Sequence, residues 1–207
     1  METPNATVLT LGHSSHPLER FVALLQRHDA ELVADVRSIP YSRRHPAYNR
    51  ESLERSLPEQ RIGYRFLGRE LGAKSPDPAC IVDGRVDYRR IAASSAFQAG
   101  LAAVITTART LRVVLLCAEQ EPLACHRTLL VARELVARGV GIAHIHADGH
   151  LEPHAELLGR LRRLVGVPEQ DLVRSEEELL AEAYARQERR IAVVVDPRAG
   201  AARGAAR

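Results

Sequence analysis

Short apolar runs alternate with amphipathic segments along the first two-thirds of the chain, and this alternation restricts the fold most. Four segments have the length and composition of buried strands: residues 7–11, 31–36, 111–117 and 142–147. Residues 18–25 and 129–136 lie between them and carry apolar side chains at helical spacing. Parallel strands need crossover connections, which helices supply. We therefore predict an α/β fold with a mostly parallel sheet flanked by helices, in a Rossmann-like arrangement of three layers.

The chain is predicted to form a single domain with a helical C-terminal extension. Residues 1–152 make up the predicted α/β core. Residues 153–196 contain two predicted helices, of which the second starts at the capping-box sequence of residues 175–178, and a predicted edge strand at 191–195. Residues 197–207 are Pro, Arg, Ala and Gly only, and we expect them to be disordered.

The middle of the chain is less regular. Residues 51–57 predict a short helix that Pro58 stops, and residues 61–67 predict another strand. Asp83 and Gly84 are typical of a hairpin turn. Residues 88–109 predict one helix that leads into the strand at 111–117.

Composition narrows the class of protein. No apolar run approaches the roughly 18 residues that a membrane-spanning helix needs, and the N-terminal residues lack the pattern of a signal peptide. We therefore expect a cytoplasmic protein without a membrane partner.

Three cysteines, an odd number, favour reduced thiols over a disulfide framework. The net charge of +3 rests almost wholly on arginine, because Lys74 is the only lysine. Arginine suits phosphate recognition, but a GC-rich genome explains the same bias.

Polar residues follow each of the predicted core strands. In parallel sheets, ligands bind in the crevice beyond the carboxyl ends of the strands. We therefore expect the residues at these ends to converge on one rim. They are Gly12-His13-Ser14, Asp35 with Arg37 and Ser38, Cys117 with Glu119, and Asp148-Gly149.

Cys125, His126 and Arg127 come directly before the predicted helix at 129–136. The unpaired N–H groups of a helix start attract anions and lower the pKa of a nearby thiol. We therefore predict that Arg127 binds a phosphate or carboxylate, and that Cys125 and His126 belong to the site. In the alternative, Cys125 packs inward while His126 and Arg127 face solvent.

A second polar cluster follows the strand at 31–36. Arg37 and Arg43 are predicted to bind phosphate together with the hydroxyls of Ser38 and Ser42, while Asp35 orients one arginine. A structural Asp–Arg pair is the alternative for Asp35.

Several histidines have open roles. His13 is a candidate acid or base at neutral pH, unless it only bonds to backbone in a tight turn. His144 and His146 lie on the same face of a predicted strand, and we interpret them as core or rim residues rather than ligands.

Cys117 ends an apolar strand, where a cysteine is usually a small buried hydrophobic residue. It is spaced eight residues from Cys125, too wide for the short cysteine pairs of structural zinc sites, so we assign no metal ligands. A divalent metal remains possible at a looser site that combines Cys117, Glu119, Cys125 or His126 with His13. No Gly-rich phosphate loop or dinucleotide fingerprint is present, so no organic cofactor is predicted.

Together these segments resemble the bacterial and archaeal family called domain of unknown function 488. The resemblance covers residues 7–149 in five motifs: Thr10-Leu11-Gly12-His13-Ser14; Asp35-Val36-Arg37-Ser38-Ile39-Pro40 with Ser42-Arg43; Leu67-Gly68 with Leu71-Gly72; Leu116-Cys117-Ala118-Glu119 with Cys125-His126-Arg127; and His144-Ile145 with Asp148-Gly149. It implies a compact α/β domain and leaves the activity open.

A weaker resemblance concerns rhodanese sulfurtransferases. The order of Asp35-Val36-Arg37 after one strand and Cys117 at the end of a later strand is similar to theirs. In those enzymes a short loop runs from the cysteine straight into the helix, whereas a longer loop intervenes here.

Our leading hypothesis is a hydrolase or group transferase that acts on a phosphate-bearing small molecule or nucleic acid. Ser14, Arg37, Arg43 and Arg127 would bind the substrate, with Ser38, Ser42 and Cys117 beside them. Glu119 or Asp35 would be the general base, and His13 or His126 the acid. One alternative is thiol or sulfur-transfer chemistry at Cys117 or Cys125, and another is a non-catalytic module that binds nucleic acid or anions. Nothing in the sequence predicts the oligomeric state.

Overall fold

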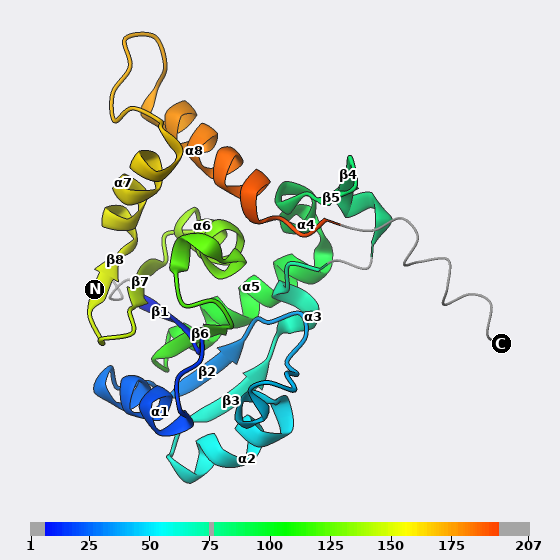
Figure 1. Ribbon diagram of the computed structural model, residues 1–207, viewed down its shortest axis with the longest axis vertical. Coiled ribbons are helices and arrows are strands. Elements are labelled where there is room, and N and C mark those ends of the chain that lie inside the picture. Colours follow the sequence, from blue (N-terminus) through cyan, green and yellow to red (C-terminus); the bar gives the residue numbers. More distant parts are fainter. Residues whose placement is uncertain (1–6, 75–76, 195–207) are drawn as a thin grey trace, which may run out of the picture.

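The computed structural model describes residues 7–74 and 77–194, and these form a six-stranded sheet with helices around it (Figure 1). The strand order is β3-β2-β6-β1-β7-β8, with β8 antiparallel to β7 and all other pairs parallel. The strands are β1 (Thr7–Gly12), β2 (Leu32–Asp35), β3 (Gly63–Phe66), β6 (Val113–Cys117), β7 (Gly141–Ile145) and β8 (Leu151–Pro153). The predicted α/β class is confirmed.

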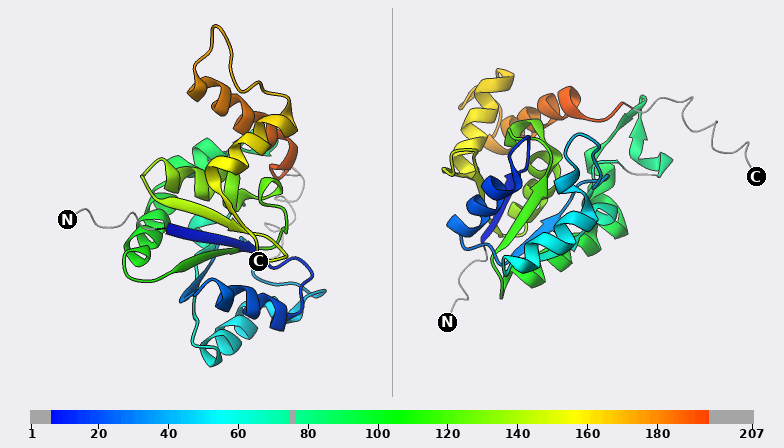
Figure 2. Two further views of the ribbon diagram at one scale, coloured as in Figure 1. Left: turned by 90° about the vertical axis from the view of Figure 1, so that its left-hand side faces the viewer. Right: turned by 60° about the horizontal axis from the view of Figure 1, so that its bottom comes forward.

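Helices cover both faces of the sheet, as three layers require (Figure 2). One face packs against α1 (Leu18–Arg27) and α2 (Arg50–Glu59), and the other against α5 (Ser95–Ala108) and α6 (Arg133–Val136). Along β6, Val114 and Leu116 belong to the first core while Val113 and Leu115 belong to the second. Burial on both faces explains why the strands read as continuous apolar runs instead of alternating with polar residues.

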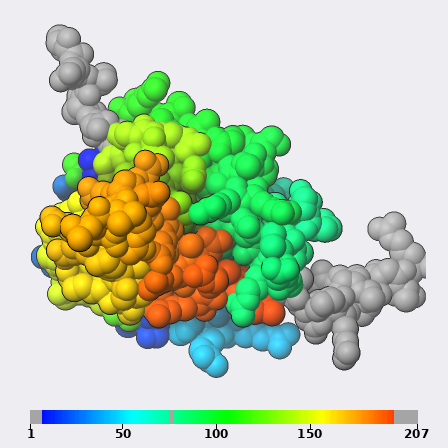
Figure 3. Space-filling model, turned by 90° about the horizontal axis from the view of Figure 1, so that it is seen from above, coloured from blue at the N-terminus to red at the C-terminus, as the bar shows by residue number. Residues whose placement is uncertain are grey.

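The C-terminal helices pack on the same core as the sheet. α7 (His154–Val165) and α8 (Glu176–Ile191) are the two predicted helices of this segment, and Leu157, Leu161 and Leu179 join the core on the α5 side. Seen from above, α8 lies between α7 and the hairpin of β4 (Ile81–Val82) and β5 (Arg85–Val86) (Figure 3). The chain thus forms a single domain with helices at its C-terminal end, while the division at residue 152 stays a prediction.

The start of α8 is stabilised by the predicted capping box. The Ser175 hydroxyl accepts a hydrogen bond from the backbone N–H of Glu178, and the Glu178 carboxylate accepts one from the backbone N–H of Ser175. We expect Ser175→Ala to lower the free energy of unfolding by about 1 kcal/mol, because it removes one partner of the unpaired helix N–H groups. Urea denaturation measures this. Ser95→Ala, at an exposed serine in the first turn of α5, is the control, and an equal loss in both variants would contradict the capping argument.

Some local predictions were wrong. The predicted helix at 88–109 is two helices, α4 (Tyr88–Ala93) and α5, because Ser94 leaves the helical conformation and its side chain caps α5. Pro58 does not stop α2 but lies in its last turn, so that the helix lacks one i→i−4 hydrogen bond there. Ile191 ends α8 instead of starting an edge strand, and Val194 forms an isolated bridge to Arg85 of the hairpin. Val195 and the tail at 197–207 are outside the described residues.

Shorter elements complete the fold. They are α3 (Gly68–Leu71), the 3-10 turns η1 (Pro46–Tyr48), η2 (Pro78–Cys80) and η3 (Pro122–Ala124), and the π-helix η4 (Arg127–Ala132), which continues into α6. Positive φ angles at Asp83 and Gly84 confirm the predicted hairpin turn. In the described part of the chain, no helix combines the length and apolar character needed to span a bilayer.

The topology marks one place for a ligand site. β1 and β6 are neighbours in the sheet, but the chain leaves β1 for α1 on one face and leaves β6 for η4 and α6 on the other. The loops therefore separate beyond the carboxyl ends of these two strands. Such a switch point opens the crevice in which parallel α/β proteins bind ligands.

Candidate functional site

Two adjoining hollows, of about 400 and 200 Å³, open at the carboxyl ends of β1, β2 and β6. Both are lined by Arg37, Ile39, Ala118 and Glu119. The larger hollow adds residues from the loop after β1 and from the segment at 41–45, and the smaller adds Cys117, His126 and the segment at 73–74. Three of the four predicted strand ends thus converge on one rim.

The fourth predicted strand end lies elsewhere. The carbonyl oxygens of Asp148 and Gly149 are bound by the side chains of Arg27 and His28, at the end of α1. The short β7–β8 connection folds back over α1, which keeps Asp148-Gly149 from lining either hollow.

Arg37 is held by a buried hydrogen-bond network. Its guanidinium donates to both carboxylate oxygens of Asp35, at 2.8 and 2.5 Å, and to the backbone carbonyl of Tyr48 at 2.8 Å. The hydroxyl of Tyr64 donates to the same Asp35 carboxylate at 2.7 Å. Burial opposes the charge on Arg37, but its hydrogen bonds to the Asp35 carboxylate raise its pKa. Asp35 is fully buried. It therefore orients Arg37, as one of the two sequence hypotheses proposed, and is not placed to act as a base.

His13 lies between Arg37 and the ring of Tyr48. Its Nδ1 bonds the carbonyl of Ser14, so Nε2 is the acceptor that faces Nη1 of Arg37 at 3.3 Å, and its ring stacks on Tyr48. Burial, and then the charge of Arg37, lower the pKa of His13 to about 4. At pH 7 a neutral imidazole carries only one ring proton, and His13 donates that proton from Nδ1 to Ser14. The acid role predicted for His13 is therefore not supported.

Arg127 is fully buried instead of facing a ligand. Its guanidinium donates to the carbonyl oxygens of Glu119 and Gln120, at 2.5 and 3.0 Å, and to the hydroxyl of Thr10 at 3.4 Å. Each of the three guanidinium nitrogens of Arg127 thus already donates a hydrogen bond within the protein, which leaves few N–H groups for a phosphate. This geometry does not favour the predicted binding role of Arg127, which stays a prediction, and its side chain braces the loop after β6. A side chain at Gly12 would collide with the carbonyl of Glu119, which explains why β1 ends in glycine.

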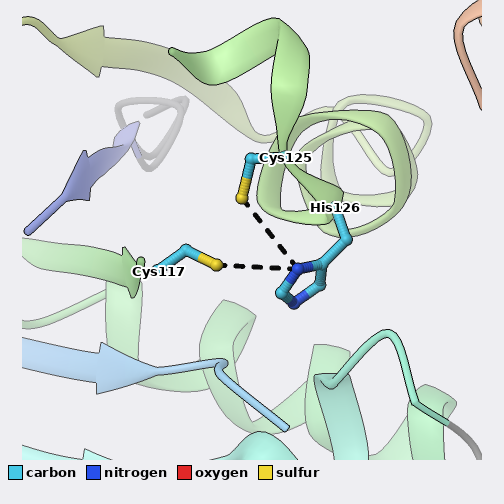
Figure 4. A group of neighbouring side chains, drawn as sticks. All are labelled: Cys117, Cys125 and His126. Carbon is cyan, nitrogen blue, oxygen red and sulfur yellow. Dashed lines mark hydrogen bonds between the residues drawn. The ribbon is translucent and has the colours of Figure 1, made fainter. Parts of the chain in front are cut away.

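Cys117, Cys125 and His126 form a compact cluster (Figure 4), and the carboxylate of Glu119 contacts both sulfurs. Sγ of Cys117 and Sγ of Cys125 lie 3.6 and 3.9 Å from Nδ1 of His126, and all three residues are buried. Oε2 of Glu119 lies 3.0 and 3.1 Å from the two sulfurs. Glu119 is the exposed member of this Cys–His–Glu cluster and lines both hollows. The eight-residue spacing does not separate the cysteines, because the loop at 118–124 folds back on itself.

The members of the Cys–His–Glu cluster strongly affect one another's pKa. Burial opposes ionisation of Cys125, but the S–H of Cys117 and the charges of Arg127 and His126 hold its pKa well below the usual range. Burial, and then contact with Cys125, raise the pKa of Cys117. Burial lowers and the Cys125 sulfur raises the pKa of His126, with a net increase. Burial and the charge of Cys125 also raise the pKa of Glu119.

The remaining predicted residues divide between the rim and the outer surface. Ser14 and Ser42 line the larger hollow, and Ser38 lines the smaller one. Cys125 lines neither hollow and is buried. Arg43 was predicted to bind the substrate, but it is exposed and lines neither hollow.

Sequence reasoning missed Lys74, whose exposed side chain lines the smaller hollow. Its backbone N–H donates to the hydroxyl of Ser38 at 3.0 Å, which fixes this segment beside β2. A side chain at Gly72 would come within 2.5 Å of that hydroxyl, so glycine is needed for the approach. The Leu71-Gly72 pair, which precedes Lys74, was the only sequence signal near this position. The neighbouring sequence does not show that this pair packs against Ser38.

Comparison with known proteins adds one finding. A family model described as "Domain of unknown function DUF488" matches residues 17–133, more than half of the chain. The chain belongs to the DUF488 family. The matched DUF488 region contains Asp35, Arg37 and the whole Cys–His–Glu cluster but begins after His13 and Ser14. No curated protein and no solved structure matches the chain. The DUF488 description assigns no activity, so a function must be argued from the site.

Proposed function

We propose that this DUF488 protein is an enzyme, a hydrolase or group transferase, that acts on a phosphate-bearing substrate bound at the switch point of its sheet. The observation that carries the proposal is the pairing, in adjoining hollows, of a rigid cationic side with a carboxylate. Arg37 and Lys74 provide the cations and Glu119 the carboxylate. A binding module needs the first feature but not the second.

The cationic side suits an anion with several oxygens. Arg37 is immobilised by Asp35, so little side-chain entropy is lost when a ligand binds it. Its charge is largely balanced by Asp35, and Lys74 then supplies the excess positive charge. Hydroxyls of Ser14, Ser38 and Ser42 add donors along both hollows. A phosphate group of a nucleotide or nucleic acid matches this set in charge and hydrogen-bonding capacity.

Glu119 is the candidate general base. Its carboxylate forms no ion pair with any residue in the described parts of the chain, and it lines both hollows. The backbone of Glu119 is fixed by Arg127, so the carboxylate does not depend on a mobile loop for its position. Positioned carboxylates of this kind accept protons from a water or a hydroxyl. Arg127 and Asp35 are then positioning residues, in place of the binding and base roles that we predicted.

Thiol or sulfur-transfer chemistry has one favourable observation, the lowered pKa of Cys125. Its sulfur is buried and lines neither hollow, however, and a nucleophile must reach its substrate. Cys117 lines the smaller hollow, but its pKa is raised. The geometry therefore supports Glu119 chemistry better.

The substrate side of the proposal is tested by calorimetry at low salt with AMP and inorganic phosphate as probes. We expect Lys74→Ala to weaken AMP binding about tenfold, the effect of losing one charge-assisted contact. Arg109→Ala, an exposed cation before the amino end of β6, is the matched control and should bind AMP normally. Absent AMP binding, or equal affinity in the wild type and Lys74→Ala, would overturn the phosphate assignment.

The catalytic side needs a separate measurement. Product analysis with nucleoside phosphates and short RNA should show turnover that Glu119→Gln abolishes while AMP affinity is kept. Tight, salt-sensitive binding of RNA without turnover, unchanged in Glu119→Gln, would instead identify a non-catalytic module.

A further inference from the structure

We propose that Cys117, Cys125 and His126 bind one zinc ion, and that Glu119 faces its fourth coordination position. The zinc site does not depend on which substrate the hollow accepts, because it consists only of the donor atoms and their surroundings. It adds a metal centre to the proposed enzyme, at the boundary between the buried core and the smaller hollow.

The donor atoms have the spacing of tetrahedral ligands. Sγ of Cys117, Sγ of Cys125 and Nδ1 of His126 all lie within 4.8 Å of one another. With zinc–sulfur and zinc–nitrogen bonds of about 2.3 and 2.0 Å, tetrahedral ligands stand roughly 3.5 Å apart. The two sulfur–nitrogen distances, 3.6 and 3.9 Å, are close to this value. Only small shifts of the side chains are needed to receive the ion.

His126 is oriented as a metal ligand should be. Its Nε2 lies 2.9 Å from the backbone carbonyl of Val36, which accepts a hydrogen bond from the ring. That bond leaves the proton on Nε2 and turns Nδ1, with its lone pair, toward the two sulfurs. Histidines that bind metals usually donate their other N–H in this way, because the bond fixes the tautomer and the ring direction.

The surroundings also favour a positive charge at this point. Two thiols, an imidazole lone pair and a carboxylate converge where little water reaches, and only shared protons or a cation can hold such groups together. The backbone N–H of Arg127 donates to Sγ of Cys125 at 3.4 Å, which stabilises a thiolate. Thiolate and imidazole donors select zinc over magnesium or calcium, which prefer oxygen ligands.

Glu119 distinguishes an open site from a closed one. Its Oε2 lies 3.0 and 3.1 Å from the sulfurs, shorter than the separation of tetrahedral ligands, and its residue is exposed. We place Glu119 beside the fourth position instead of in it. Three protein ligands with an accessible fourth position are typical of catalytic zinc, whereas structural zinc has four protein ligands.

The test is metal content and affinity in the full chain, with zinc and then cobalt(II) as probes. We expect one zinc per chain and, with cobalt, thiolate charge-transfer absorption of a tetrahedral site. Cys117→Ser, Cys125→Ser and His126→Asn should each lower zinc affinity at least 100-fold. Cys80→Ala is the matched control, a buried cysteine outside the cluster, and should keep one zinc. Glu119→Gln should keep zinc within about tenfold.

Because a ligand variant can fail to fold, X-ray absorption of the zinc-loaded wild type is a second measurement. It should show two sulfur ligands and one imidazole. A wild type that binds no zinc, ligand variants that retain it, or rapid alkylation of both cysteines by iodoacetamide in zinc-treated protein would overturn the site. Loss of zinc in Glu119→Gln equal to that in Cys117→Ser would overturn the open fourth position. The effect of Lys74→Ala on AMP affinity tests the proposed function separately, and its outcome does not depend on whether zinc binds.

Discussion

Replacing Arg127 by methionine is expected to lower the free energy of unfolding by about 3–5 kcal/mol, because the substitution leaves several buried acceptors without a donor. The guanidinium is fully buried and donates to two backbone carbonyls and to the Thr10 hydroxyl. Methionine has a similar length but no donor. The loop after β6 loses its attachment to β1, and water must enter or the loop must move.

Urea denaturation compares this variant with two others. Arg163→Met, an exposed arginine of α7 with a 3.6 Å contact to Glu169, should cost less than about 1 kcal/mol. Arg127→Lys retains the charge but not the planar fork, and should be intermediate. If Arg127→Met is as stable as Arg163→Met, the bracing role is refuted.

Acid should destabilise the protein through two buried histidines. His144 Nδ1 lies 2.8 Å from the Thr10 hydroxyl, His144 Nε2 lies 3.0 Å from His154 Nδ1, and His154 Nε2 lies 3.0 Å from the Tyr184 hydroxyl. Burial, and then the charge of His154, lower the pKa of His144 to about 2, and burial lowers that of His154 to about 4. Arg127, His146 and Arg160 act on His144 in the same direction, while Glu152 opposes the shift at His154.

The sign follows from the unfolded chain, where both imidazoles regain a pKa near 6.5. Below pH 6.5 these two histidines bind protons in the unfolded state but not in the folded state. The free energy of unfolding therefore decreases as the pH falls from 6.5 toward 4. Between pH 7 and pH 5 we expect the two histidines to remove about 2–4 kcal/mol from the free energy of unfolding.

The slope of the free energy of unfolding against pH measures how many protons the two histidines bind on unfolding. His154→Gln should reduce the slope near pH 5 by about one proton, because one buried imidazole with a lowered pKa is gone. His150→Gln, an exposed histidine in the β7–β8 connection, should leave it unchanged. A wild-type slope equal to that of His154→Gln would show that the imidazole is protonated in the fold.

Local sequence patterns were sufficient for the framework. Apolar runs and turn residues report on neighbours a few positions away, and the strands and helices found this way place Arg37 and Glu119 correctly at one rim. Convergence followed from a general property of parallel sheets and not from any detail of this chain.

The differences between expectation and structure concern residues whose partners are distant in sequence. Arg127 stands at a helix start, where a local argument places it against a ligand, but its acceptors come from β1 and from the folded loop after β6. Lys74 carries no local signal and reaches the hollow only because Ser38 binds its backbone.

The sequence by itself determined the α/β class, the order of strands and helices, and which loops supply polar residues, since these depend on periodicity and turn chemistry. Only the tertiary structure decided which charged groups are buried and paired, and which remain open to a ligand. It also brought Cys117 and Cys125 together with His126 across a wide spacing. Burial and pairing are set by long-range contacts, and identical local sequence can face water or core depending on what packs against it.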